Sequence, residues 1–205
     1  MVLDSTERRQ ERRRLEEQAI QEGRLPPGQS LTLKWPVLHA ADVPQFDLAT
    51  WRFRIWGLVE RPRDLSWQDF SALPRTTSRS DIHCVTRWSK LDNVWEGPSG
   101  KLVLEVASPL PSARFALVHA PGYTANLPIE ALRDGDVLFA LKHDGEDLVP
   151  EHGYPVRLVV PSRYFWKSVK WVTGMEFIEN DEPGFWEQRG YHNEGDPYRE
   201  ERFGI

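Results

Sequence analysis

Cysteine is nearly absent from this sequence, since Cys84 is the one cysteine among 205 residues. One thiol cannot form an internal disulfide, and it cannot build a zinc or iron–sulfur centre whose ligands are all cysteines. The Cys-x-x-Cys-His motif of covalently attached haem is excluded for the same reason.

Long apolar runs and an excess of basic charge are also absent. No run of about 18 apolar residues occurs, so we expect no membrane insertion. The formal net charge of -5 argues against a nucleic-acid partner. Residues 1–21 are charged and lack the apolar core of a secretory signal, so we expect a cytoplasmic protein. Neither Gly-x-Gly-x-x-Gly nor a P-loop occurs, and the usual dinucleotide and triphosphate sites are therefore missing.

Composition divides the chain into three regions. Residues 1–30 mix charges of both signs without an apolar stripe, which predicts a solvated N-terminal extension. Residues 31–180 have the mixed pattern of polar and apolar residues that is typical of a compact folded domain. Residues 181–205 form a tail in which Phe185 and Trp186 need cover, so we expect the tail to pack on the domain. The alternative is that these aromatic residues line a substrate entrance or meet a partner.

Strand patterns outnumber helical ones within the central region. Residues 52–57 alternate polar and apolar side chains, as a half-buried strand does. Short helices are expected after Ser66, with Asp69 completing a capping box, and over residues 101–107. Residues 86–98 are expected to be a loop. Further strands are expected at residues 79–85, 114–119, 137–141, 155–160 and 168–178. This pattern predicts an α+β fold with mixed β-sheets and short helices.

The segment around Cys84 leaves two roles open. A lone cysteine at the end of a strand is most often a small buried hydrophobic residue. Here His83 precedes it and Arg87 follows it, and nearby positive charge favours the thiolate that ligates metals or attacks substrates. A cysteine hydrolase is the weaker version of the reactive role. Adjacent residues on a strand point to opposite faces, so His83 would be poorly placed as the base.

Two later segments carry groups that suit an anion. His152 and Arg157 lie on either side of a stiff Gly-x-Pro turn, which is either an ordinary turn or an anion site. If residues 168–171 are extended, Ser168 and Lys170 share one face. A hydroxyl beside an ammonium suits a phosphate, although an ordinary amphipathic strand has the same pattern.

These segments together resemble a known family. Three motifs carry the resemblance, namely His-Gly-x-Pro-x-Arg, Val-Val-Pro and Lys-Ser-Val-Lys-Trp at residues 152–157, 159–161 and 167–171. They are similar to the pterin-phosphate-binding stretch of sulfite oxidases and of the catalytic subunit of bacterial methionine-sulfoxide reductase. Those enzymes place a molybdenum-ligating cysteine upstream, where Cys84 stands here. Residues 122–128 resemble the stretch that carries the active-site tyrosine. Order and spacing agree over roughly residues 32–180, so the chain resembles the short cytoplasmic branch of bacterial sulfite-oxidase-like oxidoreductases.

The resemblance implies a sulfite-oxidase-type molybdopterin-binding fold and a role for particular residues. Cys84 would be the thiolate ligand of molybdenum in a molybdopterin cofactor. Tyr123 would stand near the metal, and Arg87 would attract an oxyanion substrate. The implied contacts to the cofactor are His39, His83, His152, Arg157, Lys167, Ser168 and Lys170.

The implied activity is oxygen-atom transfer on a small-molecule substrate, with electrons passed to or from a separate carrier. Sulfite oxidases place adjacent arginines beyond the cysteine, whereas this chain has the single Arg87, and this departure argues against sulfite. One alternative is reduction of a sulfoxide or another oxide with the same cofactor. Another is a molybdopterin-binding module without turnover.

Overall fold

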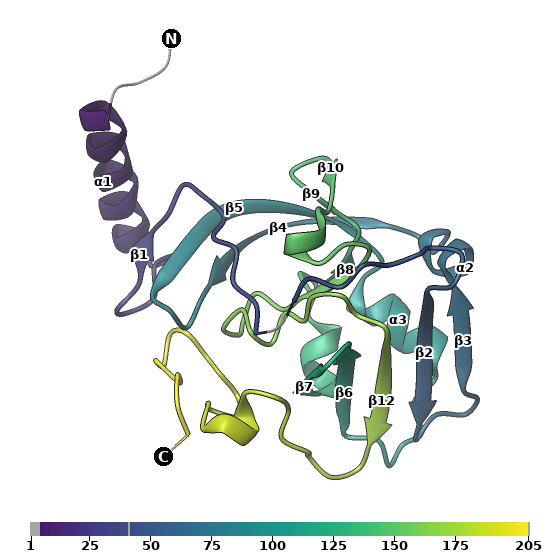
Figure 1. Ribbon diagram of the computed structural model, residues 1–205. Coiled ribbons are helices and arrows are strands. Elements are labelled where there is room, and N and C mark those ends of the chain that lie inside the picture. Colours follow the sequence, from purple (N-terminus) through teal and green to yellow (C-terminus); the bar gives the residue numbers. More distant parts are fainter. Residues whose placement is uncertain (1–4, 41, 205) are drawn as a thin grey trace.

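Mixed β-sheets joined by short helices make up the structure over residues 5–40 and 42–204, as described by a computed structural model (Figure 1). Residues 1–4 of the expected N-terminal extension, residue 41, and residue 205 of the expected tail lie outside the described residues. Parallel and antiparallel strand pairs occur in the same sheets. The α+β class predicted from the sequence is confirmed.

One sheet supplies most of the core. Its order is β3 (Arg63–Ser66), β2 (Arg52–Gly57), β12 (Gly174–Ile178), β6 (Phe115–Ala120) and β7 (Tyr123–Pro128). The alternation predicted for residues 52–57 is confirmed, because Phe53 and Ile55 are buried while Arg52 and Arg54 are exposed. The helix α3 (Gly100–Ala107) adds Val103 to the same hydrophobic cluster. Some of the loops that form the site connect strands of this closely packed sheet.

The second sheet is built around β5 (Trp88–Gly97) and β4 (Thr76–His83), which pair antiparallel. The hairpin β9–β10 (Lys142–His143 and Glu146–Asp147) and the short β1 (Ser30–Leu31) also join it. A separate pair joins β11 (Arg157–Val159) to β8 (Leu138–Ala140). The loop predicted for residues 86–98 is therefore wrong. Ser89 and Asn93 are buried polar residues in β5, and they interrupt the apolar alternation by which a strand is recognised.

Residues 168–178 are only partly a strand. The small helix α2 (Trp67–Ser71) has the predicted Ser66–Asp69 capping box. In contrast, β12 begins at Gly174, and the residues before it form turns. The backbone N–H groups of Lys167 and Ser168 donate to carbonyls three residues back, and no strand accepts them. The predicted extension of residues 168–171 is therefore wrong.

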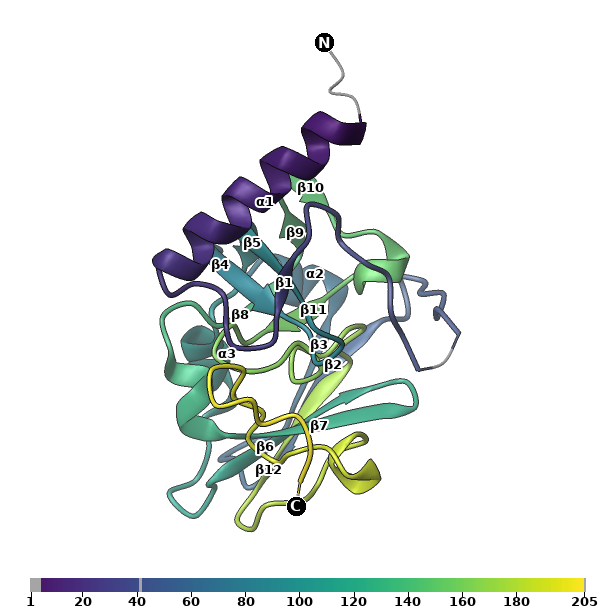
Figure 2. The same cartoon turned by 90° about the vertical axis from the view of Figure 1, so that its left-hand side faces the viewer.

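The first helix and the C-terminal tail lie beyond the two sheets (Figure 1). The charged helix α1 (Ser5–Gln21) projects from the body, and its last turn buries Ala19 (Figures 1 and 2). The C-terminal tail leaves β12 and crosses below the turn that joins β4 to β5 (Figure 1). Tyr198 of the tail donates a hydrogen bond to the carbonyl of Arg24, so the two terminal segments meet. Within the described residues, none of the helices is long and apolar enough to cross a membrane.

Candidate active site

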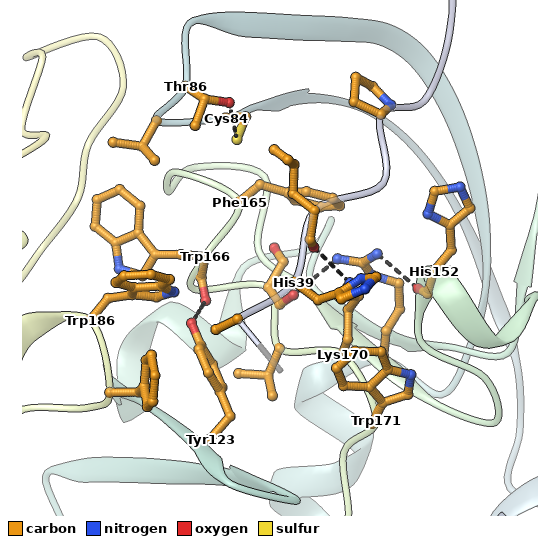
Figure 3. Close-up of a pocket in the computed structure, with 18 of the residues that line it drawn as sticks. His39, Cys84, Thr86, Tyr123, His152, Phe165, Trp166, Lys170, Trp171 and Trp186 are labelled. Carbon is orange, nitrogen blue, oxygen red and sulfur yellow. Dashed lines mark hydrogen bonds between the residues drawn. The ribbon is translucent and has the colours of Figure 1, made fainter. Parts of the chain in front are cut away.

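A cavity of about 400 Å³ lies where the loops of both sheets and the C-terminal tail converge (Figure 3). Its wall includes Cys84 from the β4–β5 turn and Tyr123 from the start of β7. The segment between β11 and β12 contributes Ser168 and Lys170, and the tail contributes Trp186. Residues far apart in the sequence therefore share one cavity, and the side chains at its two ends differ in chemistry.

Cys84 stands at one end of the cavity, directly after β4. The N–H of Cys84 donates to the carbonyl of Trp88, and the N–H of Arg87 donates to the carbonyl of Cys84, which closes a tight turn. The Sγ of Cys84 and the Oγ1 of Thr86 are 3.1 Å apart and share a hydrogen bond. Burial raises the pKa of the Cys84 thiol. Without a metal, this thiol is a protonated and weakly reactive group.

Arg157 forms the buried part of the opposite end. Its side chain is 2 % exposed, and Nη1 and Nη2 donate to the carbonyls of His152 and Ser168 at 2.9 and 3.0 Å. The guanidinium carbon lies 4.1 Å from the centre of the Phe165 ring. Burial lowers the pKa of Arg157 to about 9, so it is still a cation at neutral pH. Its Nε atom is buried and has no partner in the described part of the chain.

Lys170 and His152 flank this arginine. The Nζ of Lys170 donates to the carbonyls of Leu38 and Glu151 at 2.8 and 3.0 Å. Burial, and to a smaller extent the nearby charge of Arg157, lowers the pKa of Lys170 to about 7. Burial also lowers the pKa of His152 to about 4, so its imidazole is neutral at pH 7.

Close packing explains the glycine in the His-Gly-x-Pro motif. Gly153 has φ 111°, and a Cβ atom there would lie 2.9 Å from the Cβ of Arg157 and 3.2 Å from that of Lys170. Glycine therefore lets the turn approach both cations. The His152 ring stacks on the Trp35 ring with 3.7 Å between ring centres. The His39 ring is tilted against the Trp171 ring, with 6.0 Å between ring centres (Figure 3). Sequence reasoning missed Trp35, because no local pattern connects it to His152.

Aromatic side chains cover the cavity near the thiol. The hydroxyl of Tyr123 donates to the carbonyl of Trp166 at 2.7 Å, and Trp186 lies beside Trp166 (Figure 3). Phe185 and Tyr191 complete this wall from the tail. Burial, and to a smaller extent nearby negative charge, raises the pKa of Tyr123 well above its usual value, so the phenol keeps its proton. The side chains at this end can therefore exclude water from the space beside the thiol.

Two expected contacts lie outside the cavity. The buried ring of His83 has its Nδ1 atom 2.8 Å from the Oγ of Ser89, and burial lowers its pKa to about 4. The Nζ of Lys167 lies 2.6 Å from the Oε1 of Glu187 and also donates to Asn126. Both side chains are engaged within the protein. The contacts to the cofactor that the sequence predicts for His83 and Lys167 therefore have no support in this geometry and stay predictions.

Arg87 is the third residue that the structure does not bring to the cavity. Its φ of 72° turns the chain back toward β5, and its side chain is exposed. A Cβ atom built on Gly28 would lie 3.1 Å from Nη1 of Arg87, so the guanidinium lies beside the N-terminal segment. The expected attraction of an oxyanion by Arg87 has no support in this geometry. The other expected residues, His39, Cys84, Tyr123, His152, Arg157, Ser168 and Lys170, all line the cavity.

Several known proteins are similar in sequence to most of this chain. A family model described as oxidoreductase molybdopterin binding domain matches residues 40–186. The chain is 47% identical over 188 residues to the uncharacterized oxidoreductase YuiH of Bacillus subtilis, covering 91% of this chain and 95% of that protein. It is 29% identical over 160 residues to the protein-methionine-sulfoxide reductase catalytic subunit MsrP of Campylobacter jejuni, covering 69% of this chain and 54% of that protein.

A solved structure shares the fold. The sulfane dehydrogenase SoxCD from Paracoccus pantotrophus matches with a TM-score of 0.62 and 25% identity. The match covers 67% of this chain and 40% of that chain. This chain therefore spans nearly all of the first relative, but only about half of the sulfoxide reductase subunit and less than half of the sulfane dehydrogenase.

Proposed function

The chain belongs to the oxidoreductase molybdopterin-binding domain family, and we propose that it reduces a small neutral oxide, such as an organic sulfoxide, by oxygen-atom transfer. It is a molybdopterin-dependent oxidoreductase with the sulfite-oxidase-type fold. The expectations of this fold, enzyme class and cofactor are confirmed. The substrate, the direction of the reaction and the roles of individual residues are the proposal.

The residues of the cavity fit the cofactor. A thiol lies at one end, where a soft ligand suits molybdenum, and cations lie at the other, where a phosphate needs them. Two further observations favour a ligand at the cationic end: the buried Nε of Arg157 lacks a partner, and a Cβ atom at Gly153 would crowd Arg157 and Lys170. Cys84 would hold the metal. The residues that would hold the pterin and its phosphate are His39, His152, Arg157, Ser168 and Lys170.

The observation that carries the substrate proposal is that, in the described part of the chain, no cationic side chain lines the thiol end of the cavity. Over residues 5–40 and 42–204, the lining residues from the Cys84 turn, from β7 and from the tail are all neutral, namely Val85, Thr86, Trp88, Tyr123, Phe185, Trp186 and Tyr191, and so are Phe165 and Trp166. An oxyanion such as sulfite or nitrate would lose its hydration there without a paired charge, which is costly. A neutral oxide with apolar substituents would lose little and would gain contact with the aromatic wall.

The chain's own groups then have distinct tasks. When bound, the cofactor supplies a two-electron redox centre. Tyr123 keeps its proton and donates a hydrogen bond to the carbonyl of Trp166, so it holds the aromatic wall in place beside the substrate. Trp166 and Trp186 cover the apolar substituents and exclude water. The overall reaction is sulfoxide plus two electrons and two protons to sulfide plus water, with the electrons coming from a separate carrier.

Steady-state assays of the loaded protein test the proposal. The protein would be produced in a host that makes the cofactor, and oxidation of reduced benzyl viologen would be followed with dimethyl sulfoxide, methyl phenyl sulfoxide and nitrate. Sulfite oxidation would be measured with ferricyanide. We expect turnover of the sulfoxides and little of the anions. Efficient sulfite oxidation would overturn the proposal, and a fully loaded protein without turnover would favour the binding-module alternative. A cytoplasmic location is part of the proposal and is tested by cell fractionation.

A further inference from the structure

Two buried side chains from outside the family-matched residues hold the backbone beside Cys84. The Nε2 of Gln29 donates to the carbonyl of Cys84 at 3.0 Å, and the Nη1 of Arg202 donates to the carbonyl of Val85 at 2.6 Å. Gln29 is 8 % exposed and Arg202 is 7 % exposed. The family match covers residues 40–186, so neither side chain belongs to it.

The turn that they hold is strained. Arg87 closes the turn with φ 72°, a conformation that residues other than glycine seldom adopt. Such a turn persists when its surroundings restrain it. The guanidinium of Arg202 provides one restraint on Val85, and it also reaches the carbonyl of Pro27 at 3.4 Å. Arg202 therefore connects the Cys84 turn to the N-terminal segment.

The tail keeps Arg202 in place through its own backbone. The N–H of His192 donates to the carbonyl of Arg202, and Tyr191 forms a bridge with Phe203. The guanidinium carbon of Arg202 lies 5.0 Å from the centre of the buried Tyr164 ring. Tyr191 also lines the cavity, so the same short stretch of tail reaches both the aromatic wall and the cysteine turn.

We propose that Arg202 is a positioning residue that fixes the Cys84 turn and places a positive charge next to the metal-ligating thiolate. This inference rests on the proposed role of Cys84 as the metal ligand. Sequence reasoning assigned the nearby positive charge to His83 and Arg87, but His83 is buried and neutral and Arg87 is exposed. Arg202 acts on the thiol electrostatically from a buried site, where solvent screens a charge less than at the surface.

Three variants separate the hydrogen bond from the charge. Arg202→Lys keeps the charge and one donor group, Arg202→Gln keeps a donor without the charge, and Arg202→Met removes both. Arg199→Met is the matched control, because Arg199 lies on the same tail with its side chain 71% exposed and pairs with Glu201. Each protein would be purified from a host that makes the cofactor. Molybdenum per chain, the visible absorption of the thiolate–metal bond, the reduction potential and the thermal midpoint would be measured.

We expect Arg202→Met to lower molybdenum content at least twofold and to shift the absorption band. Arg202→Gln should keep most of the metal but lower the reduction potential, since a lost positive charge makes addition of an electron harder. Arg202→Lys should restore the potential, and Arg199→Met should match the parent protein. If Arg202→Met does not fold, the comparison of Arg202→Gln with Arg202→Lys still tests the charge.

Two outcomes would overturn this role. Arg202→Met with unchanged molybdenum, absorption and potential would show that the turn does not depend on Arg202, and equal potentials in Arg202→Gln and Arg202→Lys would refute the effect of its charge. These outcomes can be told apart from the case in which Cys84 is not the metal ligand. In that case Cys84→Ser would retain the absorption band of the parent protein, whatever the Arg202 variants show.

Discussion

The two ends of the cavity have opposite chemistry although they belong to one continuous space. At the cationic end, which is proposed to hold the phosphate of the cofactor and is called the phosphate end below, Arg157 and Lys170 donate to backbone carbonyls. At the thiol end, Tyr123 and Trp186 provide hydroxyl, indole and ring surfaces without charge. Under the proposed function, positive charge therefore lines the cavity where the phosphate of the cofactor would bind, and the lining where the substrate would bind is neutral. The phosphate end can be general to the family, whereas the thiol end can determine which oxide this chain accepts.

The largest effect should come from the thiol end, through Cys84→Ser. Loss of the soft ligand should reduce viologen-dependent turnover by more than about 100-fold, the upper range for losing an outer-shell partner of a metal site. The visible absorption of the thiolate–metal bond should disappear while the thermal midpoint stays close to that of the parent protein. Thr86→Ser keeps the hydroxyl beside Sγ and is the control. Turnover within a few-fold of the parent would contradict the assignment of Cys84.

At the phosphate end, Lys170→Met should weaken retention of the cofactor. A hydrogen bond to a charged group contributes about 1.5–3 kcal/mol, which corresponds to roughly 10- to 100-fold in affinity. Molybdenum and released pterin should both fall after extensive dialysis, since the pterin phosphate loses its contact. Lys101→Met removes an exposed lysine from α3 and should change neither quantity. A loss of turnover with full cofactor content would instead assign Lys170 to the chemical step.

The phosphate end should also respond to pH. The pKa of Lys170 is lowered to about 7, so in protein made without cofactor its cationic form is present below pH 7 and lost as the pH rises above it. Sulfate keeps its charge across this range, and its binding should weaken several-fold between pH 6 and 8.5, as followed by calorimetry. Arg157, with a pKa of about 9, remains charged over most of this window. Lys170→Arg should remove the pH dependence, and an unchanged slope in that variant would contradict the assignment to Lys170.

The phosphate end was the easier one to predict from the sequence. His152, Arg157 and Lys170 lie within one short stretch, and the turn around Gly153 brings their side chains together by local geometry. Even here the prediction was incomplete, because it relied on an extended segment that is a series of turns. Lys167 consequently faces Glu187, away from the cavity.

The thiol end could not be assembled in the same way. Its wall combines Tyr123 with aromatic residues of the tail. Hydrophobic periodicity predicts local secondary structure, and it does not predict contacts between segments so far apart. The strand that follows Cys84 was also hidden by the buried Ser89 and Asn93. As a result, sequence reasoning placed the positive charge near Cys84 at the exposed Arg87, whereas we propose that the buried Arg202 supplies it. The fold class follows from local pattern, whereas the substrate side of the cavity depends on tertiary packing.

The smallest effect expected is also the most specific test of the contrast between the ends. Aromatic contacts contribute about 0.5–1.5 kcal/mol beyond their buried area, so Trp186→Ala should lower kcat/KM for methyl phenyl sulfoxide by roughly 2- to 10-fold. Dimethyl sulfoxide lacks the ring, and its kcat/KM should change less. Trp56→Ala is the control, since Trp56 lies on β2 against His119 and does not line the cavity. Equal losses for both sulfoxides would mean that Trp186 supports the cavity without selecting its substrate, whereas a larger loss for the aryl substrate, with molybdenum content unchanged, would assign specificity to the tail.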